Sequence, residues 1–198
     1  NERASCKIIG VTLETRPDCI NEGEIRRFRE FGCTRVQLGI QHTHRDILEL
    51  VNRQAFREDA VRALRLLKDN CFKIDLHLMP DLPGATPEKD LDMFRDVLFH
   101  PDLQADQWKI YPCEITPWTV IKKWFDEGRY VPYGHDKLVE VLRWAKIRVH
   151  PWIRLNRVVR DIPNQYIYGG AVSKPNMRED VLRQMREAGE RCRCIRCR

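Results

Sequence analysis

The chain has 198 residues, of which 42% are hydrophobic, a content that supports a folded core and excludes a disordered protein. No stretch approaches the run of about eighteen apolar residues that a membrane-spanning helix needs, and the N-terminus lacks the pattern of a signal peptide. Five of the eight cysteines are scattered singly, which excludes a disulfide scaffold. We therefore predict a soluble, cytoplasmic protein of one ordinary or two small domains, without a membrane partner.

The net charge of +6 is concentrated in the last third of the chain. Residues 1–141 hold 21 Lys and Arg against 24 Asp and Glu, whereas residues 142–198 hold 14 against 5. All but two of those 14 cations are arginine, whose planar guanidinium group suits phosphate. The last third is therefore a candidate RNA-binding region, and a solvated basic face without a partner is the alternative.

The hydrophobic pattern predicts strands and helices in alternation. In chain order these are a strand at 7–14, a helix at 22–31, a strand at 34–40, a short helix at 43–50, a helix at 55–69, a strand at 73–79, a helix from 87 to about 98, a strand at 107–111, helices at 117–127 and 135–148, and a strand at 152–159. Thr86 is the expected N-cap of the fourth helix, with Pro87 in its first turn.

This alternation predicts an α/β fold, with parallel strands joined by right-handed helical crossovers. Four or five strand–helix units are too few to close an eight-unit barrel. The candidates are therefore a partial (βα) barrel of the TIM type, with outer helices, and an open doubly wound sheet.

Polar residues recur at the carboxyl ends of the expected strands, where α/β folds bind their ligands. These positions hold Glu14 to Asp18, Gly39 to His42, His77 to Asp81, Lys109 to Pro112, and Arg154 to Arg157 with Arg160 beyond. An acid, an amide, a histidine, a lysine and arginines on one rim suit a zwitterionic or phosphorylated ligand.

Each of these residues also has a structural explanation. Glu14 and Arg16 suit an exposed ion pair of little energetic value. His77 suits a hydrogen-bonded core histidine, and Lys109 suits a side chain that extends from a strand end to solvent. The recurrence at one topological position on successive strands favours a binding site.

Several segments resemble one known family. They are ETRPD at 14–18, GCTRVQLGIQ at 32–41, the pair Asn52-Arg53 before a helix, HLMPDLPG at 77–84, KIYP at 109–112, and RLNRVVRDIP at 154–163. In this order they are similar to the catalytic subunit of Elongator. That family modifies the wobble uridine of tRNA and combines a radical S-adenosylmethionine barrel with an acetyltransferase domain.

The resemblance implies S-adenosylmethionine and a four-iron four-sulfur cluster as cofactors and acetyl-CoA as co-substrate. It implies that the cofactor is cleaved to a 5′-deoxyadenosyl radical, which acts on the acetyl group. Cofactor contacts are implied for Glu14, Arg16, Gln41, Arg53 and Met79. Catalytic roles are implied for His77 and Lys109.

Two features depart from the family. Its iron–sulfur ligands are three cysteines near the start of the barrel, the last two separated by two residues, and no segment before Cys113 has that pattern. The acetyltransferase domain that the resemblance implies after the barrel is not expected within these 198 residues. We therefore expect the central part of a larger enzyme, inactive alone, with its cluster ligands outside this chain. The alternatives are a radical enzyme acting on a small molecule, such as a porphyrinogen, and a non-catalytic tRNA-binding module.

We divide the chain into a partial barrel at 1–163 and a basic extension at 164–198. The extension ends in Cys192, Cys194 and Cys197. Three thiolates within six residues suit one tetrahedral ion, and zinc is the metal expected, with a reduced, frayed tail as the alternative. The spacing differs from the C-x3-C-x2-C of radical enzymes, so these cysteines are not assigned to the iron–sulfur cluster.

Arg154, Arg157 and Arg160 are the predicted RNA contacts. Trp152 and Tyr166 lie nearby in sequence for base stacking, so this stretch is the candidate for binding the tRNA anticodon stem-loop. The alternative is that the arginines pair with acidic residues within the fold, namely Asp161, Glu179 and Asp180. The resemblance also implies other Elongator subunits as partners.

Overall fold

The computed structural model describes residues 2–159, 162, 164–170 and 177–198. Its strands are β1 (Val11–Thr15), β2 (Cys33–Gln41), β3 (Lys73–Leu78), β4 (Gln107–Ile110), β5 (Glu114–Ile115), β6 (Arg154–Val158) and β7 (Gly169–Gly170). Its α-helices are α1 (Glu22–Glu30), α2 (Arg45–Leu50), α3 (Arg57–Asp69), α4 (Pro87–Phe99), α5 (Val120–Asp126), α6 (His135–Arg148) and α7 (Met177–Glu187).

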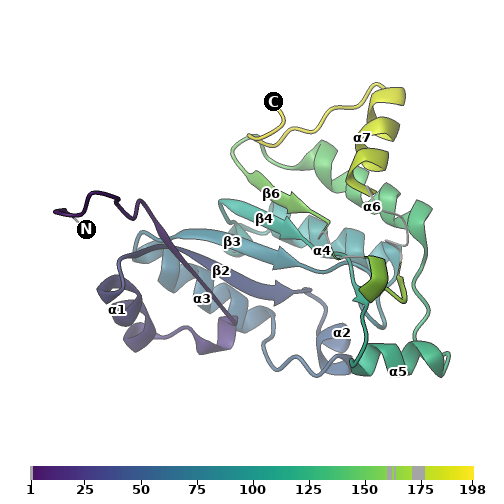
Figure 1. Ribbon diagram of the computed structural model, residues 1–198, viewed down its shortest axis with the longest axis horizontal. Coiled ribbons are helices and arrows are strands. Elements are labelled where there is room, and N and C mark those ends of the chain that lie inside the picture. Colours follow the sequence, from purple (N-terminus) through teal and green to yellow (C-terminus); the bar gives the residue numbers. More distant parts are fainter. Residues whose placement is uncertain (1, 160–161, 163, 171–176) are drawn as a thin grey trace.

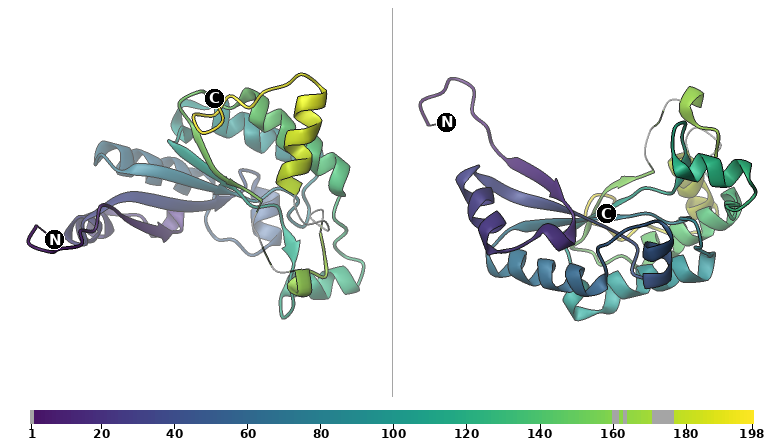
Figure 2. Two further views of the ribbon diagram at one scale, coloured as in Figure 1. Left: turned by 45° about the horizontal axis from the view of Figure 1, so that its top comes forward. Right: turned by 90° about the horizontal axis from the view of Figure 1, so that it is seen from below.

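Five strands form one parallel sheet in the order β1-β2-β3-β4-β6 (Figure 1). The sheet is curved, and the helices that connect its strands lie along its outer side (Figure 2). The predicted partial barrel with outer helices is therefore confirmed. All six helices expected from the sequence are present, with ends shifted by at most three residues.

Local sequence explains where the helices begin and which face they bury. The Thr86 side chain accepts a hydrogen bond from the Lys89 backbone, as an N-cap does, and Pro87 occupies the first turn of α4. Phe94 of α4 packs on Trp108 of β4, with 6.2 Å between ring centroids, and both are fully buried. The core therefore lies between the sheet and the outer helices.

Three features differ from the sequence-based expectations. The first strand begins at Val11 instead of residue 7. Val11 pairs with Cys33, the first residue of β2, so residues 7–10 have no residue of β2 to pair with. The short antiparallel pair of β5 and β7 was not expected. The helix α7 was also missed, although its buried Met177, Val181 and Met185 follow helical spacing, because its charged residues obscured the pattern.

The C-terminal tail packs on the sheet and on α6. The Arg193 backbone donates to the Lys146 carbonyl, and the Ile195 backbone donates to the Ile153 carbonyl, both at 3.1 Å. The tail is therefore anchored along the part that the structure describes, and the division of the chain at residue 163 stays a prediction. Across the described ranges, no helix combines the length and apolarity needed to cross a bilayer.

Candidate active site at the strand ends

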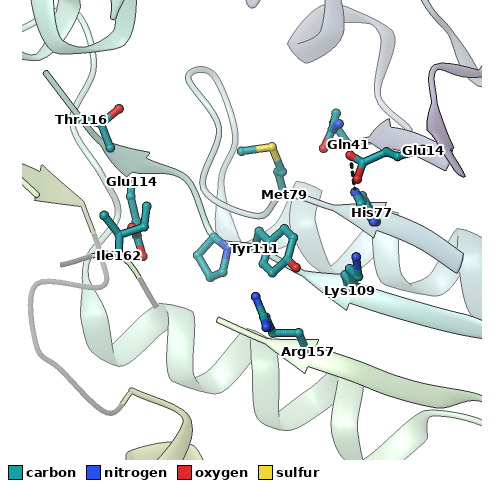
Figure 3. A pocket seen from close by; sticks show the side chains of 11 residues that line it. Glu14, Gln41, His77, Met79, Lys109, Tyr111, Glu114, Thr116, Arg157 and Ile162 are labelled. Atoms are coloured by element: carbon teal, nitrogen blue, oxygen red, sulfur yellow. Dashed lines mark ion pairs between the residues drawn. The ribbon is translucent and has the colours of Figure 1, made fainter. Parts of the chain in front are cut away.

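A cavity of about 460 Å³ lies at the carboxyl ends of the parallel strands (Figure 3). It is lined by Glu14, Gln41, His77, Met79, Lys109, Tyr111, Pro112, Glu114, Thr116, Arg157 and Ile162. The sheet strands β1, β2, β3, β4 and β6 each contribute a polar residue to this wall. The expected convergence of strand-end residues is therefore seen in the structure.

Strand register explains which residues meet. His77 is paired with Lys109 across β3 and β4, and Lys109 is paired with Arg157 across β4 and β6. A bulge after Trp108 inserts Asn156 on the β6 side, so Lys109 faces Arg157 instead of Asn156. This one-residue shift brings a second cation to the cavity wall.

A hydrogen-bond network joins three of the cavity residues through Gln37. The Gln37 Oε1 atom lies 2.6 Å from Lys109 Nζ and 3.1 Å from His77 Nε2. On the other side of the ring, His77 Nδ1 lies 3.2 Å from Glu14 Oε1, and Figure 3 shows this contact as a dashed line. The pKa of His77 is lowered, chiefly by burial, while the Glu14 carboxylate opposes the shift.

A second polar row lies deeper along the same strands. Asp75 Oδ2 accepts a hydrogen bond from Asn156 Nδ2 at 2.7 Å, and Asn156 also contacts Gln107. The pKa of Asp75 is raised, chiefly because burial disfavours its charged form. The inner side of this sheet is therefore polar, which suits a ligand-binding surface instead of an apolar barrel core.

Two predicted cofactor residues lie outside the cavity wall. Arg16 does not pair with Glu14; its Nε donates to Asp18 Oδ1 at 3.0 Å. Arg53 donates from Nη2 to the Gly39 carbonyl at 2.6 Å, and its pKa is lowered by burial and then by the neighbouring Arg16. Arg53 therefore lies beside the cavity residue Gln41, and the charge of Arg16 is paired with Asp18.

Gly39 makes room for the side chains beside it. A Cβ atom at this position would lie 2.8 Å from Arg53 Nη2 and 2.7 Å from Gln41 Nε2. The glycine in the LGIQ segment thus lets Arg53 pack on the strand end next to Gln41.

A buried polar cluster holds the MPDLPG segment, whose Met79 lines the cavity. Asp90 accepts hydrogen bonds from the Asp81 backbone and the Tyr133 hydroxyl, both at 2.7 Å, and its Oδ1 lies 3.0 Å from His42 Nε2. Met79, which lines the cavity, donates its backbone hydrogen to the Gln41 carbonyl at 2.7 Å. The segment is therefore fixed at Met79 by β2 and at Asp81 by the Asp90 cluster.

The three predicted RNA contacts do not all converge. Arg157 lies in the cavity wall, Arg154 is exposed and donates from Nε to Asn156 Oδ1 at 2.9 Å, and Arg160 lies outside the described residues. Trp152 stacks on His150, with 4.6 Å between ring centroids, before the amino end of β6. Trp152 is thus at the opposite end of the strand from the cavity.

One of the acidic residues that were candidates to pair with these arginines has other partners. Asp180 pairs with Arg183 at 3.1 Å and lies 3.5 Å from His135 Nε2, so its partners are not on β6. Asp161 lies outside the described residues.

The terminal cysteines form a compact group, with the sulfur atoms of Cys192, Cys194 and Cys197 all within 4.8 Å of one another. The pKa of Cys194 is lowered because the Cys192 thiol donates a hydrogen bond to it, and the pKa of Cys192 is raised by the same bond. Three soft ligands at this spacing suit a metal ion. The group lies beside Ile153, toward the amino end of β6 and away from the cavity.

Two family descriptions match the chain: residues 1–97 match the Radical SAM superfamily, and residues 105–187 match the Radical_SAM C-terminal domain. Over all its residues the chain is 40% identical to the tRNA uridine(34) acetyltransferase of Methanocaldococcus infernus and 35% identical to Elongator complex protein 3 of Homo sapiens. All of it aligns with the solved structure of M. infernus Elp3 carrying an N-terminal deletion (1–46), with a TM-score of 0.94 at 40% identity. The chain belongs to the Elongator catalytic subunit family.

This Elongator family member spans 37% and 36% of the lengths of those two curated relatives, and 46% of the solved archaeal chain. It also matches coproporphyrinogen III oxidase (HemN) from Escherichia coli, with a TM-score of 0.55 at 20% identity, over 68% of this chain and 30% of that chain. At this identity the likeness shows a shared fold only.

Some polar residues of the site were not singled out from the sequence. Gln37 and Asp75 lie on the same strand faces as Gln41 and His77, at even spacing, so the strand period alone was a sufficient signal. Tyr111 belongs to the KIYP segment at 109–112 and Glu114 begins β5, and neither was among the predicted site residues. The pairing of Asn156 with Asp75 had no sequence signal, because it depends on the bulge in β6.

Proposed function

We propose that this chain is the radical S-adenosylmethionine part of an enzyme that modifies the wobble uridine of tRNA with an acetyl group from acetyl-CoA. The observation that carries the proposal is the polar cavity to which all five sheet strands contribute, in a chain 40% identical to a protein named tRNA uridine(34) acetyltransferase. Since the chain spans about a third of its curated relatives, the activity belongs to the longer protein.

The chemistry of the cavity wall fits S-adenosylmethionine. A cofactor with an ammonium and a carboxylate needs an anion and cations opposite them, and the wall offers Glu14 with Lys109 and Arg157. Gln41 and Met79 add an amide and a thioether, and Arg16 and Arg53 are assigned to the edge of the same site. The cavity volume lies in the range of small-molecule sites, about 300–1,000 Å³. When bound to an iron–sulfur cluster, this cofactor supplies a 5′-deoxyadenosyl radical.

The iron–sulfur ligands are assigned to residues outside this chain. The one three-cysteine group found among the described residues lies toward the amino end of β6, away from the cavity. We assign zinc to that group, as a structural ion. The Lys146 side chain is almost fully buried, and its positive charge acts on Cys192 in the direction that favours a thiolate.

His77 and Lys109 are the proposed catalytic residues. Both line the cavity, and both are tied to the sheet through Gln37, which keeps them in place. An ammonium at this position stabilises negative charge that develops on a bound acyl or uridine oxygen. The imidazole is suited to hold or move a proton.

The tRNA anticodon stem-loop is the proposed partner of the basic third, with Arg154, Arg157 and Arg160 as contacts. Arg157 belongs both to this basic surface and to the cavity wall. When the target base occupies the cavity, the RNA on either side of it would lie against the arginines. The human relative is named as a complex protein, which supports other Elongator subunits as further partners, and a cytoplasmic location is proposed.

The test uses the full-length protein reconstituted with its cluster. We expect 5′-deoxyadenosine formation and a modified wobble uridine, both measured by mass spectrometry. His77→Gln and Lys109→Met should lower modification at least tenfold, whereas the matched control Lys68→Met, exposed on α3, should not. If the protein converts a small molecule and leaves tRNA unmodified, a radical enzyme acting on a small molecule replaces this proposal. If it binds tRNA without cleaving the cofactor, a non-catalytic tRNA-binding module replaces it.

A further inference from the structure

The hydrogen bonds around Gln37 determine which way its amide points. Lys109 Nζ, an ammonium with donors only, lies 2.6 Å from the Gln37 side chain. The carbonyl oxygen of Gln37 must therefore face Lys109, because a reversed amide would put two donors against each other. The same oxygen lies 3.1 Å from His77 Nε2.

This orientation determines the protonation of the His77 ring. Since Nε2 faces an oxygen that only accepts, Nε2 must carry a hydrogen. The other nitrogen, Nδ1, lies 3.2 Å from Glu14 Oε1. A neutral ring with its hydrogen on Nε2 would turn a lone pair toward the carboxylate, so one more proton is needed between Nδ1 and Oε1.

We propose that Gln37 is a positioning residue which, held by Lys109, keeps the hydrogen of His77 on Nε2 and so makes His77 and Glu14 share one exchangeable proton in the cavity wall. The shared proton follows from the hydrogen bonds of this chain. Only its use in catalysis rests on the proposed function.

Burial determines where this proton goes. The His77 side chain is 6% exposed and both ring nitrogens are engaged, whereas the Glu14 side chain is 61% exposed. The proton therefore leaves toward the cavity through Glu14. Loss of the proton breaks its bond to Glu14, forms a bond to a basic atom of the bound ligand, and leaves a lone pair and a carboxylate in contact. The pair therefore readily takes a proton back.

The groups that face His77 act on it in different directions. Glu14 from β1 favours the protonated ring, whereas burial and Lys109 from β4 oppose it. Tyr111, which follows β4, contacts the ring edge to face, with 5.8 Å between centroids. Gln37 from β2 carries no charge and acts through the direction of its amide alone.

The test is the tautomer of His77, read from nitrogen-15 spectra of histidine-labelled protein between pH 5.5 and 9, with His77→Asn to assign the signals. Where the ring is neutral, we expect the hydrogen on Nε2. In Gln37→Leu no acceptor faces Nε2, so the hydrogen should move to Nδ1 and donate to Glu14. Gln37→Glu keeps the acceptor and should keep Nε2–H. The control Gln54→Leu, at an exposed glutamine, should change nothing.

A neutral His77 ring that carries its hydrogen on Nδ1 in the parent chain, or a neutral ring that keeps Nε2–H in Gln37→Leu, would overturn the inference. If Gln37→Leu does not fold by circular dichroism, Lys109→Met takes its place, because without the ammonium the Gln37 amide is free to reverse. Nδ1–H should then appear, and its absence would also overturn the inference. These spectra need neither cofactor nor tRNA, so their outcome is independent of whether the proposed enzymatic function holds.

Discussion

Asp81 is a single buried carboxyl group placed by its chain conformation. Its backbone adopts a left-handed conformation with φ of 63°, which aspartate tolerates better than most residues, and it is 1% exposed. Its Oδ1 accepts a hydrogen bond from the Tyr133 backbone at 3.2 Å. Burial, and then the nearby Asp90, raise the pKa of Asp81 to about 7.

The raised pKa predicts that stability falls between about pH 4 and pH 7. The folded state holds the Asp81 proton more tightly than the unfolded chain, so its contribution is complete below the unfolded pKa and is lost as the pH rises through the folded pKa. At 1.36 kcal/mol for each pKa unit, the loss is about 4 kcal/mol. Asp81→Asn keeps an oxygen acceptor but has no proton to lose, so this pH-dependent loss should be absent. The free energy of unfolding should therefore fall less from pH 5 to pH 8 in the variant than in the parent chain.

Urea denaturation of both proteins at pH 5 and pH 8 measures this difference. Asp69→Asn, at an exposed carboxylate on α3, is the matched control and should leave the pH dependence unchanged. An Asp81→Asn protein with the same pH dependence as the parent would mean that this carboxyl group is ionised in the fold.

At the scale of elements, the C-terminal tail links the group of three cysteines to the packing of α6 and α7. Cys194 is fully buried, and the tail on either side of it bonds to the Lys146 and Ile153 carbonyls. The helix α7 packs on α6, and its Met177, Val181 and Met185 are buried in the core. A metal bound here would fix the C-terminal tail against α6 and the start of β6.

Zinc removal is expected to loosen this edge and leave the opposite edge of the sheet intact. Metal at one hundred times its dissociation constant stabilises the folded state by about 2.7 kcal/mol, so a chelator should lower the melting temperature by several degrees. Hydrogen exchange should increase in α7 and β6 but not in β1 or β2. Cys194→Ser should show the same change without chelator, whereas Cys71→Ser, at an exposed single cysteine, should not.

Elemental analysis of protein purified without chelator measures the metal directly. One zinc per chain is expected, with at most a trace in Cys194→Ser. Iron in place of zinc, or equal melting temperatures with and without chelator, would exclude a structural zinc site.

At the scale of the whole molecule, charge is divided between the two parts of the chain. The first 141 residues have a small negative net charge, whereas the last 57 hold nine more cations than anions. A surface of this kind binds polyanions by releasing counterions, so affinity falls as salt rises. The basic third includes β6, whose Arg157 lies at the cavity.

Replacing Arg154, Arg157 and Arg160 by alanine should weaken tRNA binding and reduce its dependence on salt. Each lost phosphate contact lowers the slope of log affinity against log salt by about one unit. Filter binding at several salt concentrations measures both quantities, with circular dichroism to confirm folding.

The matched control for this triple variant replaces three exposed arginines of the first 141 residues, Arg26, Arg62 and Arg65. It removes the same charge and should leave the affinity within about twofold, because β6 is untouched. Equal losses in the two triple variants would show that only net charge matters, and would remove the specific role given to β6.

The sequence by itself determined the order of the five sheet strands and of the first six helices, and the rim on which the site lies. Apolar periodicity and turn residues act over a few neighbours, so the parallel strands, the Thr86 cap and the strand-end polar residues were all predictable. The spacing of the three terminal cysteines likewise indicated a compact group, which the structure contains.

Tertiary structure alone decided which of these residues meet. The bulge in β6 opposes Arg157 to Lys109, and the sheet brings Gln37 between Lys109 and His77. Such pairings join residues tens of positions apart through register and side-chain direction. A shift of one residue in either strand would exchange the faces of the sheet, and local sequence does not encode that choice.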